Sequence, residues 1–599
     1  MKNILYTILL GGCLLSGVSC SDSFLEDKRD YNNMVPIDIY SDPVQANAVF
    51  ATIYKQILEQ YVHPMNGSDV LMRQDKNTGG QQYFLTEEVP SGYMSSNIVG
   101  DGRYNGNNDK NTKAGNHIAN PPYWNQPRSN TNANNGYNTW NSKTLFPTVY
   151  TINNFIIEID RTGRTAYVND EFWDQLKGQA IFARAWLYFD GLRMYGGAPF
   201  YATETEQAEP GDRSTRMTVP ESIEKICADF QAAAELLPAK WDADNDGRFT
   251  SVAALAMISR VRVYAASPVF NASWEQGKER WQAALDASLA AEAAANSAGY
   301  GSSVSNIDTW DQAFYAFNGS FNPEAIIKIA KSDLTTAGTF NKWEGFIRPG
   351  VISNSSSSGL PAPDQMLLKF PMKDGKRATA ENGYDDEKFY RNRDPRFYKT
   401  FAFSGCEWPG VNKQIWLFAY KKTDSEYRYT DGSSGDNGAQ KKSRAVVWKM
   451  SDPNVPRSGE STAGTDIMEY RYAEILLNVA ECYAALGNAG NCISYLQKVR
   501  SRVGAGTNDL VGLSDKYALI EAVLNERAVE LAYEGKRSWD MRRWMLYEGG
   551  AGFDPRLVSI DNNNIYDPEA AYGVGWKVYN GKDNEETSET TKDHSDHLR

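Results

Sequence analysis

A run of carboxylates and arginines near the end of the chain contains the residue types that acid–base chemistry needs. In "NERAVELAYEGKRSWDMRRW", residues 525–544, Glu526, Glu530 and Glu534 recur at four-residue spacing. Residues at that spacing share one face of a helix. A glycoside hydrolase uses two carboxylates as acid and base. Neighbouring carboxylates on one helix do not flank a substrate bond from opposite sides, so catalysis is the weaker interpretation.

The same stretch offers cationic partners for these carboxylates. They are Arg527, Arg537, Arg542 and Arg543, and each guanidinium can bind a carboxylate through two hydrogen bonds. We therefore predict a structural network of ion pairs that fastens the last helices to the scaffold. The chain has only 4 His, and no GxSxG or HExxH motif surrounds them, which counts against an esterase or a metalloprotease.

An acidic turn resembles the start of a calcium loop. In "DADNDGRFT", residues 242–250, three aspartates stand at alternate positions before Gly247; they are Asp242, Asp244 and Asp246. The twelfth position of such a loop holds Ala253, where a bidentate Glu is expected, so the set of ligands is incomplete. A turn leading into a helix capped by Thr250 or Ser251 explains the same residues without a metal. We expect no required cofactor, and calcium stays open at this turn.

Aromatic residues stand in two long polar stretches, residues 62–140 and 300–465, which are rich in Asn, Gly, Ser or Pro. Their aromatic content argues against disorder, and long ordered loops are commonly functional. A ring displayed there can stack on the apolar face of a sugar, while Asp, Asn and Arg bind its hydroxyls. The residues concerned are Asp101, Arg103, Tyr104, Tyr123, Trp124, Tyr315 and Trp343. The alternative for any single ring is packing within its loop.

The first residues have the form of a secretory signal peptide that ends at a cysteine. Lys2 precedes a largely apolar run over residues 4–18, and the small residues Gly17 and Ser19 lead to Cys20. We predict a signal peptide over residues 1–19, acylation of Cys20 and a polar, acidic tether over 20–40. Each buried methylene adds ~0.8 kcal/mol, so several acyl chains hold firmly. The alternative is an ordinary signal peptide in which Cys20 is incidental.

Four further cysteines remain outside the leader: Cys227, Cys406, Cys482 and Cys492. They form no CxxC pattern, and the chain has few histidines that could complete a set of zinc ligands, which argues against a zinc site. Cys482 and Cys492 are close enough in sequence to meet across a helix turn. Buried free thiols are the interpretation we favour.

The bulk properties exclude some partners. The chain of 599 residues has a net charge of −13, and acidic residues are spread along it rather than grouped in blocks. This argues against nucleic acid as a ligand. The most apolar helix-like run beyond the leader, residues 251–270, carries Arg260 and Arg262 and ends at Pro268. We therefore expect a soluble body held by its lipid.

Helices are the elements that must position these residues. Apolar positions from Phe172 to Leu187 step by three and four residues, and Gly196 ends the run. Similar patterns predict helices over 221–237 and 250–267 and another around Trp281. Residues 471–502 predict two helices joined by a Gly/Asn turn at 487–491, as in a tetratricopeptide hairpin, although no strict 34-residue period continues elsewhere.

Four blocks together resemble the SusD/RagB family of outer-membrane nutrient-binding lipoproteins from Bacteroidetes. They are "LKGQAIFARAWLYFDGLRMYGGAPF" (176–200), "GRFTSVAALAMISRVRVYAASPVF" (247–270), "EYRYAEILLNVAECYAALGN" (469–488) and the block at 525–544. The resemblance implies a mainly α fold, in which tetratricopeptide-like helix pairs carry large irregular loop-rich insertions. One such domain would cover residues 41–599, with insertions at about 62–140 and 300–465.

The resemblance also implies a function. Family members bind glycans at the cell surface, without catalysis, and deliver them to a SusC-like TonB-dependent transporter in the outer membrane; RagB-type members handle peptides. Acidic residues after the lipidated cysteine resemble the export signal for the outer face of that membrane. The family's glycan sites, carried over to this sequence, imply ligand-binding roles for Arg103, Tyr104, Tyr315, Trp343, Asp101 and Trp124. A peptide-binding protein and a surface glycoside hydrolase are the alternatives.

Overall fold

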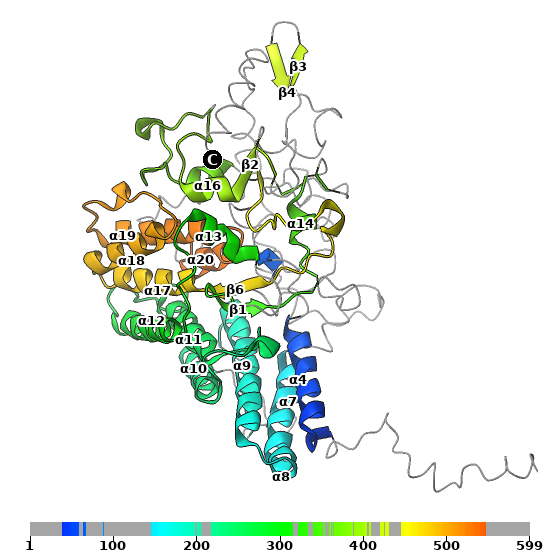
Figure 1. Ribbon diagram of the computed structural model, residues 1–599. Helices are drawn as coiled ribbons and strands as arrows, with labels where there is room; N and C mark the ends of the chain where they lie inside the picture. The colour runs from blue at the N-terminus through cyan, green and yellow to red at the C-terminus, as the bar shows by residue number, and fades with distance from the viewer. Residues whose placement is uncertain are drawn as a thin grey trace, which may run out of the picture.

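The structure is a computed structural model that describes residues 39–58, 64–66, 88, 145–197, 201–204, 217–315, 321–332, 340–349, 352–353, 359–360, 362, 364–386, 388–403, 406–408, 420–423, 426–429 and 445–546. This part of the chain is mainly helical (Figure 1). The longer helices are α4 (Pro43–Leu58), α7 (Leu145–Glu158), α9 (Asp170–Tyr195), α10 (Val219–Leu236), α11 (Ser251–Ala266), α12 (Glu279–Ser297), α17 (Tyr472–Ala485), α18 (Ala489–Ser501) and α19 (Lys516–Glu530).

Short elements join and extend these helices. The short α-helices are α8 (Arg164–Ala166), α13 (Ile307–Gln312), α14 (Trp343–Ile347), α15 (Asp364–Lys369), α16 (Pro395–Thr400) and α20 (Arg537–Arg543). The strands are β1 (Ala325–Ile329), β2 (Phe401–Phe403), β3 (Tyr420–Thr423), β4 (Glu426–Tyr429), β5 (Ala445–Val447) and β6 (Ile467–Arg471). Single turns of 3-10 or π helix are η2 (Pro64–Asn66), η5 (Ile159–Gly163), η6 (Ala243–Asn245), η7 (Ala313–Tyr315), η8 (Ala380–Asn382), η9 (Arg457–Gly459) and η10 (Asn508–Leu510).

The ends of the helices follow from their capping residues. The side chain of Asn169 accepts a hydrogen bond from the backbone N–H of Phe172 and starts α9, and Gly196 ends the helix at φ +82°. Thr218 and Glu221 form a reciprocal capping box at the start of α10. The helices predicted from apolar spacing over 172–187, 221–237 and 250–267 are confirmed.

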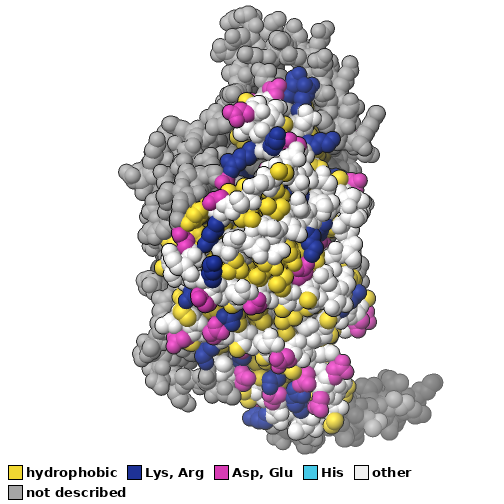
Figure 2. All heavy atoms as spheres, turned by 90° about the vertical axis from the view of Figure 1, so that its left-hand side faces the viewer, with side chains coloured by type: hydrophobic (Ala, Val, Ile, Leu, Met, Phe, Trp, Pro, Cys, Tyr) yellow, Lys and Arg dark blue, Asp and Glu magenta, His cyan; other side chains and the backbone are white. Residues whose placement is uncertain are grey.

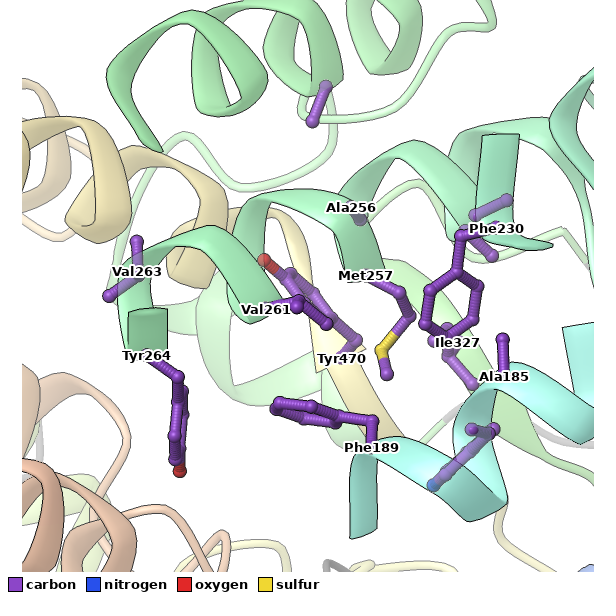
Figure 3. Packing of buried hydrophobic residues seen from close by; sticks show 14 of the residues in the cluster. Ala185, Phe189, Phe230, Ala256, Met257, Val261, Val263, Tyr264, Ile327 and Tyr470 are labelled. Carbon is purple, nitrogen blue, oxygen red and sulfur yellow. The ribbon is translucent and has the colours of Figure 1, made fainter. Parts of the chain in front are cut away.

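The long helices pack in a continuous series. Helix α9 contacts α7 and α10, α10 contacts α11, and the series continues through α12 to α17 and its neighbours α18 and α19 (Figure 1). Side chains from α9, α10, α11, β1 and β6 converge in the core that this series encloses, and Met257 lies among Phe189, Phe230 and Ile327 (Figure 3). Helix α11 is buried nearly all round, as its sequence predicts.

The helix pair predicted near the C-terminal end is present. Helices α17 and α18 pack against each other, and the chain turns between them at Gly487, whose φ is +75°. Cys482 and Cys492 are both buried, free thiols, which confirms the interpretation that we favoured. Burial raises the pKa of the Cys492 thiol to about 12. The fold class, mainly α with paired helices, is confirmed.

Residues 300–465 hold more regular structure than the loops expected there. Strand β1 pairs antiparallel with β6, and β2 pairs antiparallel with β5. Strands β2 and β5 belong to a second hydrophobic core, which includes Trp310, Trp343 and Trp408. Rings in Gly- and Asn-rich sequence are buried here because short helices and strand pairs, each too small to form a core alone, pack around them.

The predicted ion-pair network is confirmed, and its three glutamates are buried. Glu530 binds Arg396 through Nη1 at 2.8 Å and Arg471 through Nη1 at 2.8 Å. Glu526 accepts hydrogen bonds from Arg396 and from Arg500, and Glu534 accepts from Lys449 and from Arg471. A carboxylate face that is occupied in this way cannot reach a substrate.

The cations in this network come from elements far away in the sequence. They belong to α16, α18, β6 and the residues after β5. The block's own arginines bind elsewhere: Arg527 pairs with Asp540 at 2.8 Å, and Arg543 pairs with Glu481 and Asp540. The expectation that partners would come from within residues 525–544 is therefore wrong for the three glutamates, because tertiary packing brings other arginines to their helix face.

Candidate functional site

A short helix presents three residues of the candidate site. Asn306 starts α13: its Oδ1 accepts hydrogen bonds from the backbone N–H groups of Asp308, at 3.0 Å, and Thr309, at 2.9 Å. The chain continues from α13 into η7, which ends at Tyr315. Steps of three and four residues place Asp308, Asp311 and Tyr315 on one side of this helical segment.

That side borders a surface hollow of about 600 Å³. Its lining residues are Asp308, Asp311, Gln312, Tyr315, Lys399, Pro453 and Asn454. They come from α13, from η7, from α16 and from the segment after β5. The volume falls within the ~300–1,000 Å³ that ligand pockets usually have. We name this feature the Tyr315 hollow.

Lys399, near the end of α16, joins the two aspartates of the hollow. Its Nζ lies 3.1 Å from Oδ2 of Asp311 and 3.3 Å from Oδ1 of Asp308. The side chain of Asp308 is 71% exposed and that of Asp311 is 14% exposed. Asp308 therefore keeps most of its lone pairs available to a ligand, while Asp311 belongs to the wall.

Tyr315 is a neighbour of Asp311 in the hollow. Its ring packs partly against the second hydrophobic core, and its phenol is close enough to Asp311 for this carboxylate to affect its pKa. Burial and the neighbouring Asp311 charge raise the pKa of Tyr315, so its hydroxyl stays protonated. Burial also raises the pKa of Asp311, against the opposing effect of Lys399. The ring thus has a fixed orientation at the edge of the hollow.

The hollow is tied to the buried ion-pair network beneath it. Trp310 of α13 donates a hydrogen bond from Nε1 to Oε1 of Glu530, at 2.9 Å, and Nζ of Lys449 lies 4.9 Å from the centroid of the Trp310 ring. Both contacts are buried. The helix that displays Asp308 and Asp311 is therefore positioned by charges in the interior.

The opposite rim is built on Asp452 and Glu344. The backbone N–H and the side-chain amide of Asn454 both donate to Oδ1 of Asp452, at 2.8 and 3.0 Å. The backbone N–H of Asp452 in turn donates to Glu344, at 2.6 Å. Burial raises the pKa of Glu344 to about 7, against the opposing effect of Arg348. These bonds fix the rim by both main-chain and side-chain contacts.

The ligand-binding and lipidation residues predicted from the sequence fall into three groups in the structure. Tyr315 lies at the hollow, half-buried. Trp343 does not: it is only 1% exposed, and its Nε1 donates to the backbone carbonyl of Lys449 at 2.7 Å. The expectation that the Trp343 ring is displayed in a loop is therefore wrong, because the second core buries it. The remaining predicted residues lie outside the described ranges; they are Cys20, Asp101, Arg103, Tyr104, Tyr123 and Trp124.

The sequence interpretation overlooked the polar residues of the hollow. Asp308, Asp311 and Gln312 stand before Tyr315 at helical spacing, and the preceding Asn306 signals a helix start, so the sequence did contain a sign of this face. Nothing comparable marks Lys399 or Asn454. Their arrival at the hollow is a consequence of tertiary folding.

Two of the three aspartates in the acidic turn at residues 242–250 are paired with other protein groups. Oδ1 of Asp242 accepts from the backbone N–H of Asn245 at 3.0 Å and from its side chain at 2.9 Å. Asp246 forms an ion pair with Lys328, whose Nζ also lies 3.2 Å from Asp466. Among the described residues, no group of three or more His, Cys, Asp or Glu side chains is arranged to hold a metal ion.

Comparison with known proteins gives a consistent result. A model of the "SusD family" matches residues 323–597, and a second, described as "Starch-binding associating with outer membrane", matches residues 89–263. The chain is 26% identical over 385 residues to SusD-like protein P38 of Formosa agariphila. That alignment covers 62% of this chain and 66% of the relative, just under two thirds of its length. A second SusD-like protein of the same organism is 23% identical over 416 residues.

Solved structures show that the fold is shared. A SusD-like protein of Bacteroides fragilis superposes with a TM-score of 0.59 at 19% identity, over 85% of this chain and 87% of that one. A SusD-like carbohydrate-binding protein of the same species gives 0.59 at 18% identity, over 94% and 100%. A laminarin-binding SusD-like protein gives 0.53 at 18% identity, over 87% and 93%.

Proposed function

The chain belongs to the SusD/RagB family, whose members are non-catalytic binding proteins, and we propose on this basis that it is a glycan-binding lipoprotein of the cell surface. It captures an oligosaccharide or polysaccharide without breaking a bond. It then delivers the glycan to a partner TonB-dependent transporter in the outer membrane. The descriptions of the matching families and of its structural relatives support this assignment.

The observation that carries the proposal is the Tyr315 hollow. It combines part of an aromatic ring with two carboxylates, an ammonium and two amides. Sugars present apolar C–H faces and hydroxyl groups, which match the ring and the polar side chains respectively. Asp308 and Asp311, the two carboxylates of the hollow, stand three residues apart on one helix and share Lys399, so they do not flank a bound sugar from opposite sides as the acid and base of a glycoside hydrolase do.

A pair of tyrosine variants tests binding at the hollow. In Tyr315→Ala the ring is lost, and the contribution of an aromatic contact, ~0.5–1.5 kcal/mol beyond area burial, predicts an affinity that is about 2- to 13-fold weaker. Tyr167→Ala is the matched control, since Tyr167 is 40% exposed and directly follows α8, which lies at the lower end of the helices in Figure 1, away from α13. Retardation in gels that contain starch or laminarin, followed by calorimetry, measures the difference. Equal affinities of the two variants would contradict the assignment of the site.

The same gels separate glycan capture from its alternatives. Peptide that copurifies with the protein, with no retardation by any polysaccharide, would indicate a RagB-type peptide-binding protein instead. New reducing ends after incubation with polysaccharide would indicate hydrolysis. The buried state of Glu526, Glu530 and Glu534 supports the expectation that none appear.

Attachment to the membrane depends on Cys20. No helix in the described ranges has both the length and the apolar composition for a membrane span. We propose that acyl chains on Cys20 hold the protein at the outer membrane, facing outward. Labelling with an alkyne fatty acid tests this directly: wild type should take up label and fractionate with the outer membrane, and Cys20→Ala should do neither. Membrane retention of unlabelled Cys20→Ala would contradict the anchor.

A further inference from the structure

The charges of the Tyr315 hollow point to one class of glycan. Three of its seven lining side chains are charged, namely Asp308, Asp311 and Lys399. Two carboxylates and one ammonium give the hollow a net charge of −1. The single cation is already shared between both carboxylates, at 3.3 and 3.1 Å. We propose, resting on the proposed function, that this hollow selects neutral, hydroxyl-rich glycans and rejects uronate or sulfated ones.

The position of Lys399 is the first reason. A carboxylate or sulfate on a sugar needs a cation that is free to pair with it. Nζ of Lys399 lies between two carboxylates, and those carboxylates raise the pKa of this lysine, so the ammonium is already compensated. An acidic sugar that bound Lys399 would have to displace one aspartate from it. The negative charge of the sugar would then lie close to the negative charge of that aspartate.

The orientation of Asp308 is the second reason. Its side chain is 71% exposed, so an incoming ligand meets this carboxylate before it meets Asp311, which is 14% exposed. A carboxylate only accepts hydrogen bonds, and two neighbouring hydroxyls of a sugar are suitable donors to its two oxygens. The same oxygens repel an anion. One group therefore both attracts hydroxyls and excludes acidic substituents.

The remaining residues that line the hollow add no competing cation. Gln312 and Asn454 are neutral amides, which donate to and accept from hydroxyls. The face in Figure 2 carries acidic and basic side chains interspersed with one another. The chain as a whole has a net charge of −13. Long-range attraction of a polyanion is therefore not expected from the described surface.

The experiment compares neutral with acidic polysaccharides on the full-length protein. Starch and laminarin are the neutral probes, and polygalacturonate and dextran sulfate are the acidic ones, each at low and high salt. Wild type should bind a neutral probe with little change on adding salt and bind each acidic probe at least tenfold more weakly. Asp308→Asn makes the hollow neutral, so its affinity for an acidic probe should rise at least threefold and its affinity for the neutral probe should fall. Asp286 is an exposed residue of α12, so Asp286→Asn removes one negative charge at a distance from the hollow. This variant should leave the affinities for the acidic and the neutral probes unchanged.

Two results would overturn the proposal, and they are distinguishable. If wild type bound dextran sulfate or polygalacturonate at least as tightly as the neutral probes, and Lys399→Gln abolished that binding, the selectivity would be refuted while the hollow remained a glycan site. If Tyr315→Ala and Asp308→Asn changed affinity for no polysaccharide, the site itself would be refuted, and the selectivity with it.

Discussion

Replacing Glu530 by Gln tests whether the buried network holds the scaffold together. The carboxylate is 1% exposed and accepts three hydrogen bonds, from Arg396, Arg471 and Trp310. An amide of nearly the same shape removes the charge and turns one acceptor into a donor. The two guanidinium groups then lose part of their compensation in the interior, where an unpaired charge is costly.

The expected loss of stability follows from the burial of the pair. Breaking a buried ion pair by removing one partner costs about 3–5 kcal/mol. An exposed pair is worth about 0–1 kcal/mol. Glu224→Gln is the matched control, because Glu224 pairs with Arg262 while its side chain is 65% exposed. The free energy of unfolding should therefore fall by several kcal/mol in the first variant and by less than about 1 kcal/mol in the second.

Urea denaturation followed by circular dichroism measures the free energy of unfolding of both variants. The same measurement over a series of pH values is a second test. The neighbouring arginines hold the pKa of Glu530 well below its usual range. A lowered folded-state pKa stabilises the protein above the unfolded value, about pH 4.3, and this contribution is lost as the pH falls toward the folded-state pKa. The difference in the free energy of unfolding between wild type and Glu530→Gln should therefore become smaller below about pH 4.3. Equal stability of Glu530→Gln and Glu224→Gln at pH 7 would refute the structural role of the network.

Three further outcomes are expected. Gly301→Ala should lower the free energy of unfolding by about 1–3 kcal/mol more than Gly299→Ala. Both glycines have a positive φ, but only at Gly301 would an added Cβ meet a tyrosine ring, that of Tyr472, at 2.6 Å. Equal losses of stability in urea denaturation would contradict this. Trp343→Phe should lower stability by about 1–3 kcal/mol through the lost hydrogen bond yet leave polysaccharide retardation unchanged; a loss of retardation would restore a binding role for this ring. Cys482 and Cys492 should resist alkylation at pH 8 until urea unfolds the chain, because both thiols are buried and their pKa values are raised; mass spectrometry of alkylated peptides identifies each one.

The sequence was most informative where the signal is local. Apolar spacing and an end at Gly196 sufficed to predict α9, and the pair α17 and α18 followed from the same periodicity with a Gly turn between them. Helical hydrogen bonds and capping contacts span only a few residues, so the order of side chains along the chain is enough to specify them.

The ion-pair network shows the limit of that information. The spacing of Glu526, Glu530 and Glu534 indicated one charged helix face, but not that Arg396 and Arg471 would cover it. Arg396 is 134 residues and Arg471 is 59 residues from Glu530 along the chain. No local rule links such positions, because their meeting depends on how whole helices and strands pack.

In the candidate site, too, some features follow from the local sequence and others depend on the tertiary structure. The sequence alone indicated the helices that have apolar residues at helical spacing, and it placed Tyr315 in a long polar stretch. Asp308 and Asp311 stand at helical spacing before Tyr315, but this stretch was expected to form a loop. Only the tertiary structure decided that Trp343 enters the core, whereas Lys399 arrives beside both aspartates. The physical reason is that residue type and spacing set which side of an element is apolar, while burial and charge pairing depend on which other element covers that side.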